Sequence, residues 1–108
     1  PALVVVCLSM EDMDPYPDAR RRAAQHQMAA PSTAMAMQTL LLAAHNAGLG
    51  ASVMCGPLFC PDTVVATLGL PAHWEPQALV TLGYPAARGK PFRRRPLDDV
   101  VVVVREPS

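Results

Sequence analysis

One segment near the middle of the chain, QTLLLAAHNAGLGASVMCGPLFCPD, limits most strongly what this sequence can fold into. Its first part is apolar on nearly every side, and a helix without a polar face is expected to be buried inside a fold. Gly48 stands where a helix needs a left-handed residue after its last turn, and the apolar Leu49 follows it. We therefore predict a central helix to Ala47, a glycine stop, a short strand over 51–54 and a Gly-Pro turn that opens a second helix.

Three further runs are predicted to form strands. Ala2–Leu8 is continuous and β-branched, which is typical of a strand buried on both faces. Residues 77–84 form another run, which ends at Gly83 and a following proline. Residues 99–105 contain five consecutive valines and are predicted to be the last strand. This order of elements predicts an α+β fold, with a sheet covered by the central helix.

A helix is also predicted before the central one. Asp18 is a suitable N-cap for a helix that runs to about Met28. Pro31 is expected to interrupt it, and Ser32 or Thr33 then caps the central helix.

Composition limits the class of protein. With 108 residues and 51% apolar content, the chain is one globular domain with a modest core. Three cysteines are too few, and odd in number, for a secreted disulfide framework, which favours a reducing, cytoplasmic location. No apolar run approaches the roughly 20 residues that span a bilayer, so no membrane segment is predicted. The chain begins without Met, directly on a predicted strand, which we interpret as a piece of a longer protein.

The charges are segregated although the formal net charge is zero. All but one of the nine Lys and Arg residues lie in the triplet 20–22 and the stretch 88–95. Guanidinium groups match phosphate oxygens, so the second stretch is a candidate phosphate site, and a solvated basic loop is the alternative. Nucleic-acid binding is not predicted, because the net charge is neutral and Phe92 is the only aromatic residue among these cations.

No group of side chains indicates acid–base, nucleophilic or metal catalysis. His45 lies near a helix end, where a histidine is usually structural. Cys55 has no visible base partner, and Cys55 and Cys60 lack further ligands at zinc spacing. We therefore predict no catalytic side chain and no metal site.

Three stretches in this order, LLLAAHNAGLGASVMCGP, LGLPAHWEPQALVTLGYP and RRRPLDDVVVV, resemble the FMN-dependent nitroreductase superfamily. The resemblance covers nearly the whole chain, but only what looks like the C-terminal half of that domain. It implies a mixed or antiparallel sheet flanked by helices with a buried central helix. Residues 1–108 then form the C-terminal portion of an FMN-binding domain.

The resemblance also implies a flavin site. In the family, the loop at this position passes the flavin ring, and its backbone groups hydrogen-bond the reactive edge of the ring. Carried over, the ring contacts are Cys55, Gly56, Pro57 and Leu58. Pro57 has no N–H, so the donor is the N–H of Gly56 or Leu58. The alternative interpretation of these residues is an ordinary strand-to-helix turn.

A phosphate site is implied further along the chain. In the family, two basic residues two positions apart hold the FMN phosphate, and Arg93 and Arg95 match that spacing. The family's Arg-rich phosphate motif, at the start of the full domain, has no counterpart here.

The implied function is an FMN-dependent oxidoreductase that forms intertwined homodimers. Hydride passes from a reduced nicotinamide or related carrier, by way of FMN, to an electron-poor small molecule. One alternative is a non-catalytic module that binds or sequesters flavin, or that only dimerises. Another is a nitroreductase-like domain of deazaflavin cofactor biosynthesis, because the sequence WEP at 74–76 resembles that branch.

Overall fold

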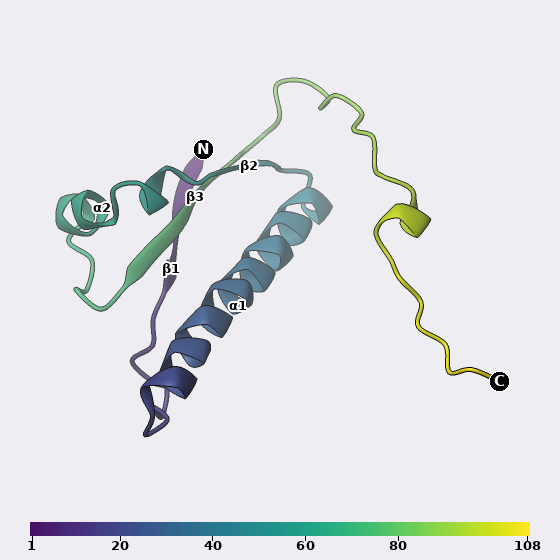
Figure 1. Ribbon diagram of the computed structural model, residues 1–108. Coiled ribbons are helices and arrows are strands. Elements are labelled where there is room, and N and C mark those ends of the chain that lie inside the picture. Colours follow the sequence, from purple (N-terminus) through teal and green to yellow (C-terminus); the bar gives the residue numbers. More distant parts are fainter.

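The computed structural model describes all residues from 1 to 108. Two α-helices, three strands and two short 3₁₀-helices follow one another along the chain (Figure 1). In chain order they are β1 (Ala2–Leu8), α1 (Ala19–Asn46), β2 (Gly50–Met54), η1 (Gly56–Leu58), α2 (Pro61–Leu68), β3 (Glu75–Gly83) and η2 (Leu97–Asp99).

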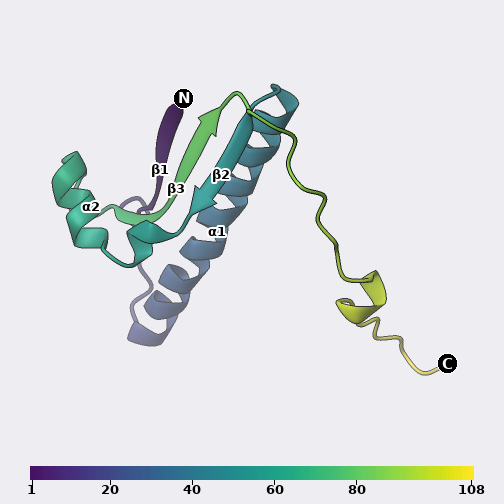
Figure 2. The same cartoon turned by 90° about the horizontal axis from the view of Figure 1, so that it is seen from above.

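The three strands form one antiparallel sheet in the order β1-β3-β2. Val80 of the central strand pairs with Val4 on one side and Val53 on the other, and its side chain is fully buried. Both views place the sheet between α1 and α2 (Figures 1 and 2). β1 is an edge strand, and Leu3 in it is 60% exposed, so the expectation that this strand is buried on both faces is wrong for this chain.

Helix α1 is continuous, which corrects the predicted interruption. Pro31 lies inside it, and Thr33 caps nothing, because its hydroxyl donates to the Ala29 carbonyl at 2.9 Å. Pro31 has no N–H, so the Gln27 carbonyl loses its helical donor. Both residues are exposed, and water can satisfy that carbonyl. The predicted N-cap is confirmed, since the Asp18 side chain accepts from the Arg21 N–H.

Helix α1 contacts the sheet along one stripe, and Ala44 is its only buried residue. A second stripe of α1 carries Met28, Met35 and Leu42, spaced seven residues apart and 64%, 63% and 61% exposed, and Met28 and Met35 border a cleft between α1 and β1. A fully buried central helix is therefore not found in the single chain. No helix in the structure combines the length and apolar character needed to cross a membrane.

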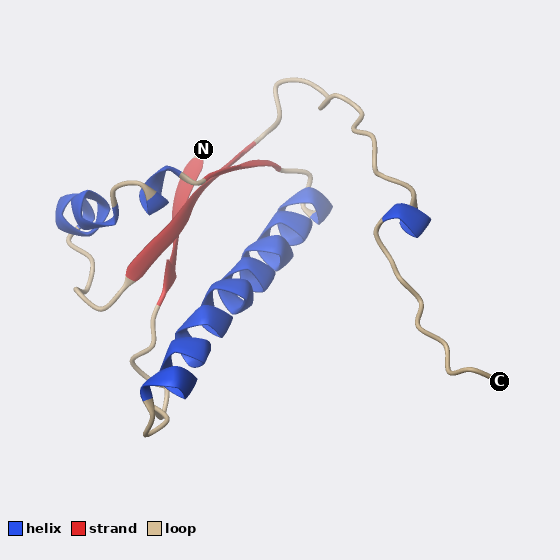
Figure 3. Cartoon of the chain, viewed as in Figure 1, coloured by secondary structure: helices blue, strands red, loops and turns tan.

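The predicted last strand over 99–105 is wrong. After β3 the chain leaves the sheet and has no regular structure except η2 (Figure 3). Val100–Val104 are all exposed. A strand requires hydrogen bonds to a neighbouring strand, and this segment does not pair with either edge of the sheet.

Candidate functional site

The turn Cys55–Leu58 follows the end of β2 and closes on itself. The Leu58 N–H donates to the Cys55 carbonyl at 3.0 Å, and the Phe59 N–H donates to the Gly56 carbonyl at 3.0 Å. Pro57 is fully buried, and η1 packs against β3. The turn is therefore a fixed element at the end of the sheet, with its backbone positioned by packing beneath it.

The backbone N–H of Gly56 in this turn remains available for a ligand. Leu58 already uses its N–H within η1, and Pro57 has none. Gly56 is the first residue of η1, so the helix leaves its N–H free. Of the two donors that the sequence left open, the geometry favours Gly56.

The space in front of Gly56 is open. A Cβ added to this residue meets no atom within 4 Å, and Gly56 has no positive φ. Its lack of a side chain is therefore required neither by backbone conformation nor by packing. A flat ligand can therefore approach the backbone here.

Side chains around the turn leave it accessible. Cys55 and Leu58 are exposed, whereas Pro57 supports the turn from below. The Cys60 thiol donates to the Gly56 carbonyl at 3.7 Å, a contact that the sequence interpretation missed. The only signal for it was the four-residue spacing of Gly56 and Cys60. Cys60 thus steadies the peptide group beside the candidate donor.

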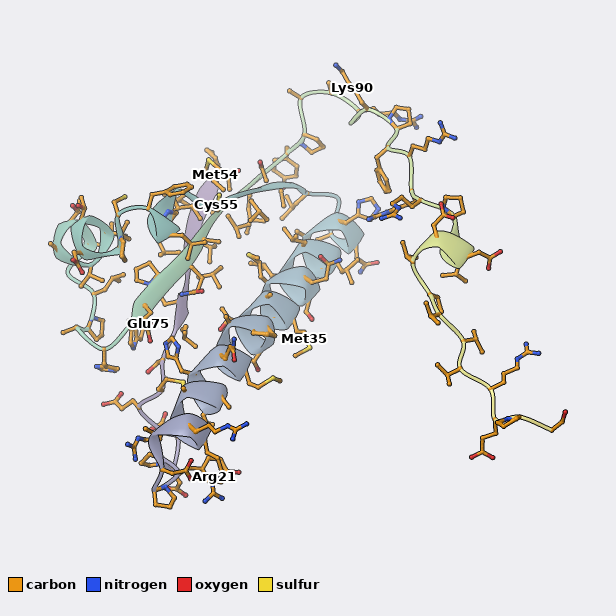
Figure 4. All side chains as sticks on the ribbon, in the orientation of Figure 1. Arg21, Met35, Met54, Cys55, Glu75 and Lys90 are labelled. Carbon is orange, nitrogen blue, oxygen red and sulfur yellow. The ribbon has the colours of Figure 1, made fainter.

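The structure does not bring Arg93 and Arg95 to this turn. Both lie in the extended segment after β3, which runs away from Cys55 (Figure 4). The Arg95 guanidinium donates to the Asp99 carbonyl at 3.4 Å, and the Arg94 guanidinium stacks 4.7 Å from the Phe92 ring centroid. In this arrangement the candidate phosphate ligands and the candidate ring contacts are separate.

Two groups whose pKa is displaced, Cys7 and Asp18, lie away from the turn. Partial burial raises the pKa of the Cys7 thiol in β1. Hydrogen bonds from the backbone and side chain of Arg21 lower the pKa of Asp18. No group of three or more His, Cys, Asp and Glu side chains is arranged to hold a metal ion. The turn can therefore position a ligand through its backbone.

Comparison with known proteins places these features in a family. The model of the nitroreductase family matches residues 1–84. A Thermus thermophilus protein described as an NADH dehydrogenase is 51% identical over 63 residues, covering 58% of this chain and 30% of that protein. Human iodotyrosine deiodinase 1 is 39% identical over 75 residues, covering 68% of this chain and 26% of that protein.

Solved structures share the fold. A Desulfovibrio desulfuricans protein, described as a nitroreductase in complex with FMN, superposes with a TM-score of 0.69 at 28% identity. The match covers 97% of this chain and 55% of that one. A nitroreductase family protein from Streptococcus pneumoniae superposes with a TM-score of 0.66 at 22% identity, over 79% of this chain and 40% of that one. These matches confirm the predicted α+β nitroreductase-like fold, present here as a partial domain.

The chain is much shorter than the proteins that it resembles. It spans 30% of the Thermus protein and 26% of the human one.

Proposed function

The chain belongs to the nitroreductase family, and from this premise we propose that it is the flavin-contacting part of an FMN-dependent oxidoreductase. The observation that carries the proposal is the exposed turn at Gly56, whose backbone N–H is free and has open space before it. The FMN complex of the Desulfovibrio relative supports the choice of cofactor. When bound, FMN supplies hydride transfer between a reduced nicotinamide or related carrier and an electron-poor small molecule.

The residues of the turn have distinct roles in this proposal. The Gly56 N–H donates to the edge of the ring, and the exposed Cys55 and Leu58 border it. Pro57 holds the turn against β3 through its buried ring. No side chain of the turn acts as an acid or base, so the protein's contribution is to hold and orient the ring.

We assign the phosphate to Arg93 and Arg95. Guanidinium groups pair with phosphate oxygens in a bidentate manner. Residues two positions apart in an extended segment present their side chains on the same side. Because these residues lie apart from the turn in the single chain, the segment that carries them must take another position in the flavin complex.

A homodimer is part of the same proposal. The stripe of Met28, Met35 and Leu42 leaves three large apolar side chains in water on one side of α1. Apolar side chains at a spacing of seven residues are suited to packing against a second helix. Val100–Val104 add a second exposed apolar segment that lacks a strand partner. Association of two copies removes this apolar surface from water.

A non-catalytic flavin-binding module is the second candidate. The separation of Arg93 and Arg95 from the turn favours it, since a chain that binds the flavin ring without the phosphate makes only part of the cofactor contacts. The third candidate function, a domain of deazaflavin cofactor biosynthesis, is supported by the WEP sequence alone. For each of these functions we propose a cytoplasmic location, which the three free cysteines support.

The test is a titration of the purified chain with FMN, followed in the visible spectrum and by flavin fluorescence. Quenched fluorescence and a shifted spectrum are expected on binding, and anaerobic NADH or NADPH should then bleach the bound flavin. Bound flavin that neither nicotinamide reduces supports the non-catalytic module. Absence of binding contradicts the proposal that this chain carries the flavin contacts.

A further inference from the structure

A cleft of about 580 Å³ opens on the side of the sheet that carries α2. It lies between η1, α2 and the start of β3, and it is separate from the Gly56 N–H, although Leu58 borders both. Among the residues that line it are Leu58, Asp62, Val65, Trp74, Glu75 and Gln77.

The walls of the cleft offer aromatic and aliphatic surface. Trp74 is the only tryptophan of the chain, and its side chain is 39% exposed. The two cation–π contacts in the structure involve Tyr16 and Phe92, so no cation of this chain occupies the Trp74 ring. Leu58 and Val65 provide aliphatic surface nearby.

The charge of the cleft has one sign. Asp62 and Glu75 line it, and none of the nine Lys and Arg residues does. Asp62 lies in the first turn of α2 and forms no ion pair. Glu75, at the start of β3 (Figure 4), is held by His26, whose Nε2 lies 2.9 Å and 3.1 Å from its two oxygens. One carboxylate is therefore free and the other is fixed in place.

We propose that this cleft binds an organic cation with an aromatic or aliphatic body. The indole face attracts a cation through its quadrupole, and indole is the best of the aromatic side chains at this. The carboxylate of Asp62 adds Coulomb attraction, and the aliphatic wall removes the apolar body of the ligand from water. Charge complementarity thus selects a cation over a neutral or anionic compound of the same shape. The site does not depend on flavin.

The experiment uses the intrinsic fluorescence of Trp74, because no other tryptophan contributes to it. The 108-residue chain is titrated with benzyltrimethylammonium chloride at constant ionic strength and without FMN. Benzyl alcohol serves as the neutral aromatic control, and tetramethylammonium serves as the cation without an apolar body. We expect a saturable change with the first compound and a weaker one, or none, with the other two.

Two variants test whether the carboxylate of Asp62 contributes to cation binding. Asp62→Asn should weaken binding of benzyltrimethylammonium about three- to fivefold, as expected for one partly exposed charge. Asp98→Asn is the matched control, because Asp98 also lies in the first turn of a short helix but outside the cleft. It should bind as the unmodified chain does.

Three results overturn the proposal: no saturable response to benzyltrimethylammonium, equal affinity for benzyl alcohol, or equal affinities of the two variants. The first assigns the cleft to packing against another protein segment. The second assigns it to neutral apolar compounds. The third removes Asp62 from the site.

Discussion

The backbone N–H of Leu49 donates a 2.9 Å hydrogen bond to the carbonyl of Ala44, and this bond closes α1 before β2 begins. The Gly48 N–H donates to the His45 carbonyl at 3.0 Å, with Gly48 at φ +77°. Together these bonds form the double-bonded helix ending that a left-handed glycine permits. The turn sets the direction in which β2 joins the sheet.

Replacing Gly48 with Ala should therefore destabilise the fold. A Cβ at Gly48 meets no atom within 4 Å, so the cost comes from the left-handed backbone, at about 1–2 kcal/mol. Urea unfolding followed by circular dichroism measures it. Gly89→Ala is the control, since Gly89 is equally open but lacks a positive φ. Equal stability of the two variants would show that φ at Gly48 has no energetic role.

Because of the Asp18 cap, we expect the fold to lose stability in acid. The Arg21 N–H lies 2.9 Å from its carboxylate oxygen, and this hydrogen bond lowers the pKa of Asp18 in the folded chain. A carboxylate whose folded pKa is depressed stabilises the fold above its unfolded pKa. That contribution is lost as the pH falls through the folded pKa, which lies below the ordinary value near 4.

Asp18→Asn separates titration from capping, because Asn also caps a helix but does not titrate. Melting temperatures at neutral pH and at about pH 3 should differ less for this variant than for the unmodified chain. Asp12→Asn removes a carboxylate from the preceding loop and serves as the matched control for the loss of one charge. If Asp18→Asn keeps the same acid dependence, other carboxylates cause it.

Gly56→Ala should weaken FMN binding about tenfold, which corresponds to about 1.4 kcal/mol. The added methyl group fits the free chain but lies between the backbone donor and an approaching ring. Fluorescence titration measures the dissociation constant, and circular dichroism checks the fold. Gly89→Ala again provides a matched control in an open position. An unchanged constant for Gly56→Ala removes this turn from the flavin site.

The double variant Arg93→Ala, Arg95→Ala should also weaken FMN binding, by about tenfold, through loss of two guanidinium partners of the phosphate. The pair Arg94→Ala, Arg105→Ala removes the same charge from the same segment and should have a smaller effect. Riboflavin, which lacks the phosphate, should bind equally well to the unmodified chain and to both double variants. Equal losses for the two double variants would indicate a nonspecific effect of charge.

Met35→Glu should convert a homodimer into a monomer. Met35 is the middle residue of the exposed stripe on α1, and an ionised side chain at a helix contact costs more than the contact contributes. Light scattering coupled to size-exclusion chromatography reports the mass. Ala34→Glu places the same charge on another side of α1 and should remain dimeric. A monomeric unmodified chain at micromolar concentration contradicts the dimer itself.

Local signals in the sequence were sufficient for the ends of elements. Asp18 as N-cap and Gly48 after α1 are both confirmed, because each end is satisfied by hydrogen bonds within a few residues. The bounds of β1, Ala2–Leu8, are those expected. The turn Cys55–Leu58 was also foreseeable, since Gly and Pro there end a strand.

Non-local features were not foreseeable. Pro31 is a strong interruption signal, but its cost is local, and α1 is held on both sides of it, by the His26 contact with Glu75 before it and by the buried Ala44 after it. Five valines in a row have high strand propensity, yet Val100–Val104 find no strand partner. Propensity acts within one segment, whereas a strand also requires a neighbour.

The sequence by itself determined the Asp18 cap, the glycine ending at Gly48, the turn and the family, because these depend on the order of neighbouring residues. The tertiary structure decided which donor of the turn is free, since the Leu58 N–H is used by the Cys55 carbonyl and the Gly56 N–H is not. It also decided that the stripe at Met35 is exposed and that the segment after β3 runs away from the turn. These properties depend on packing between distant segments, which no pattern of adjacent residues encodes.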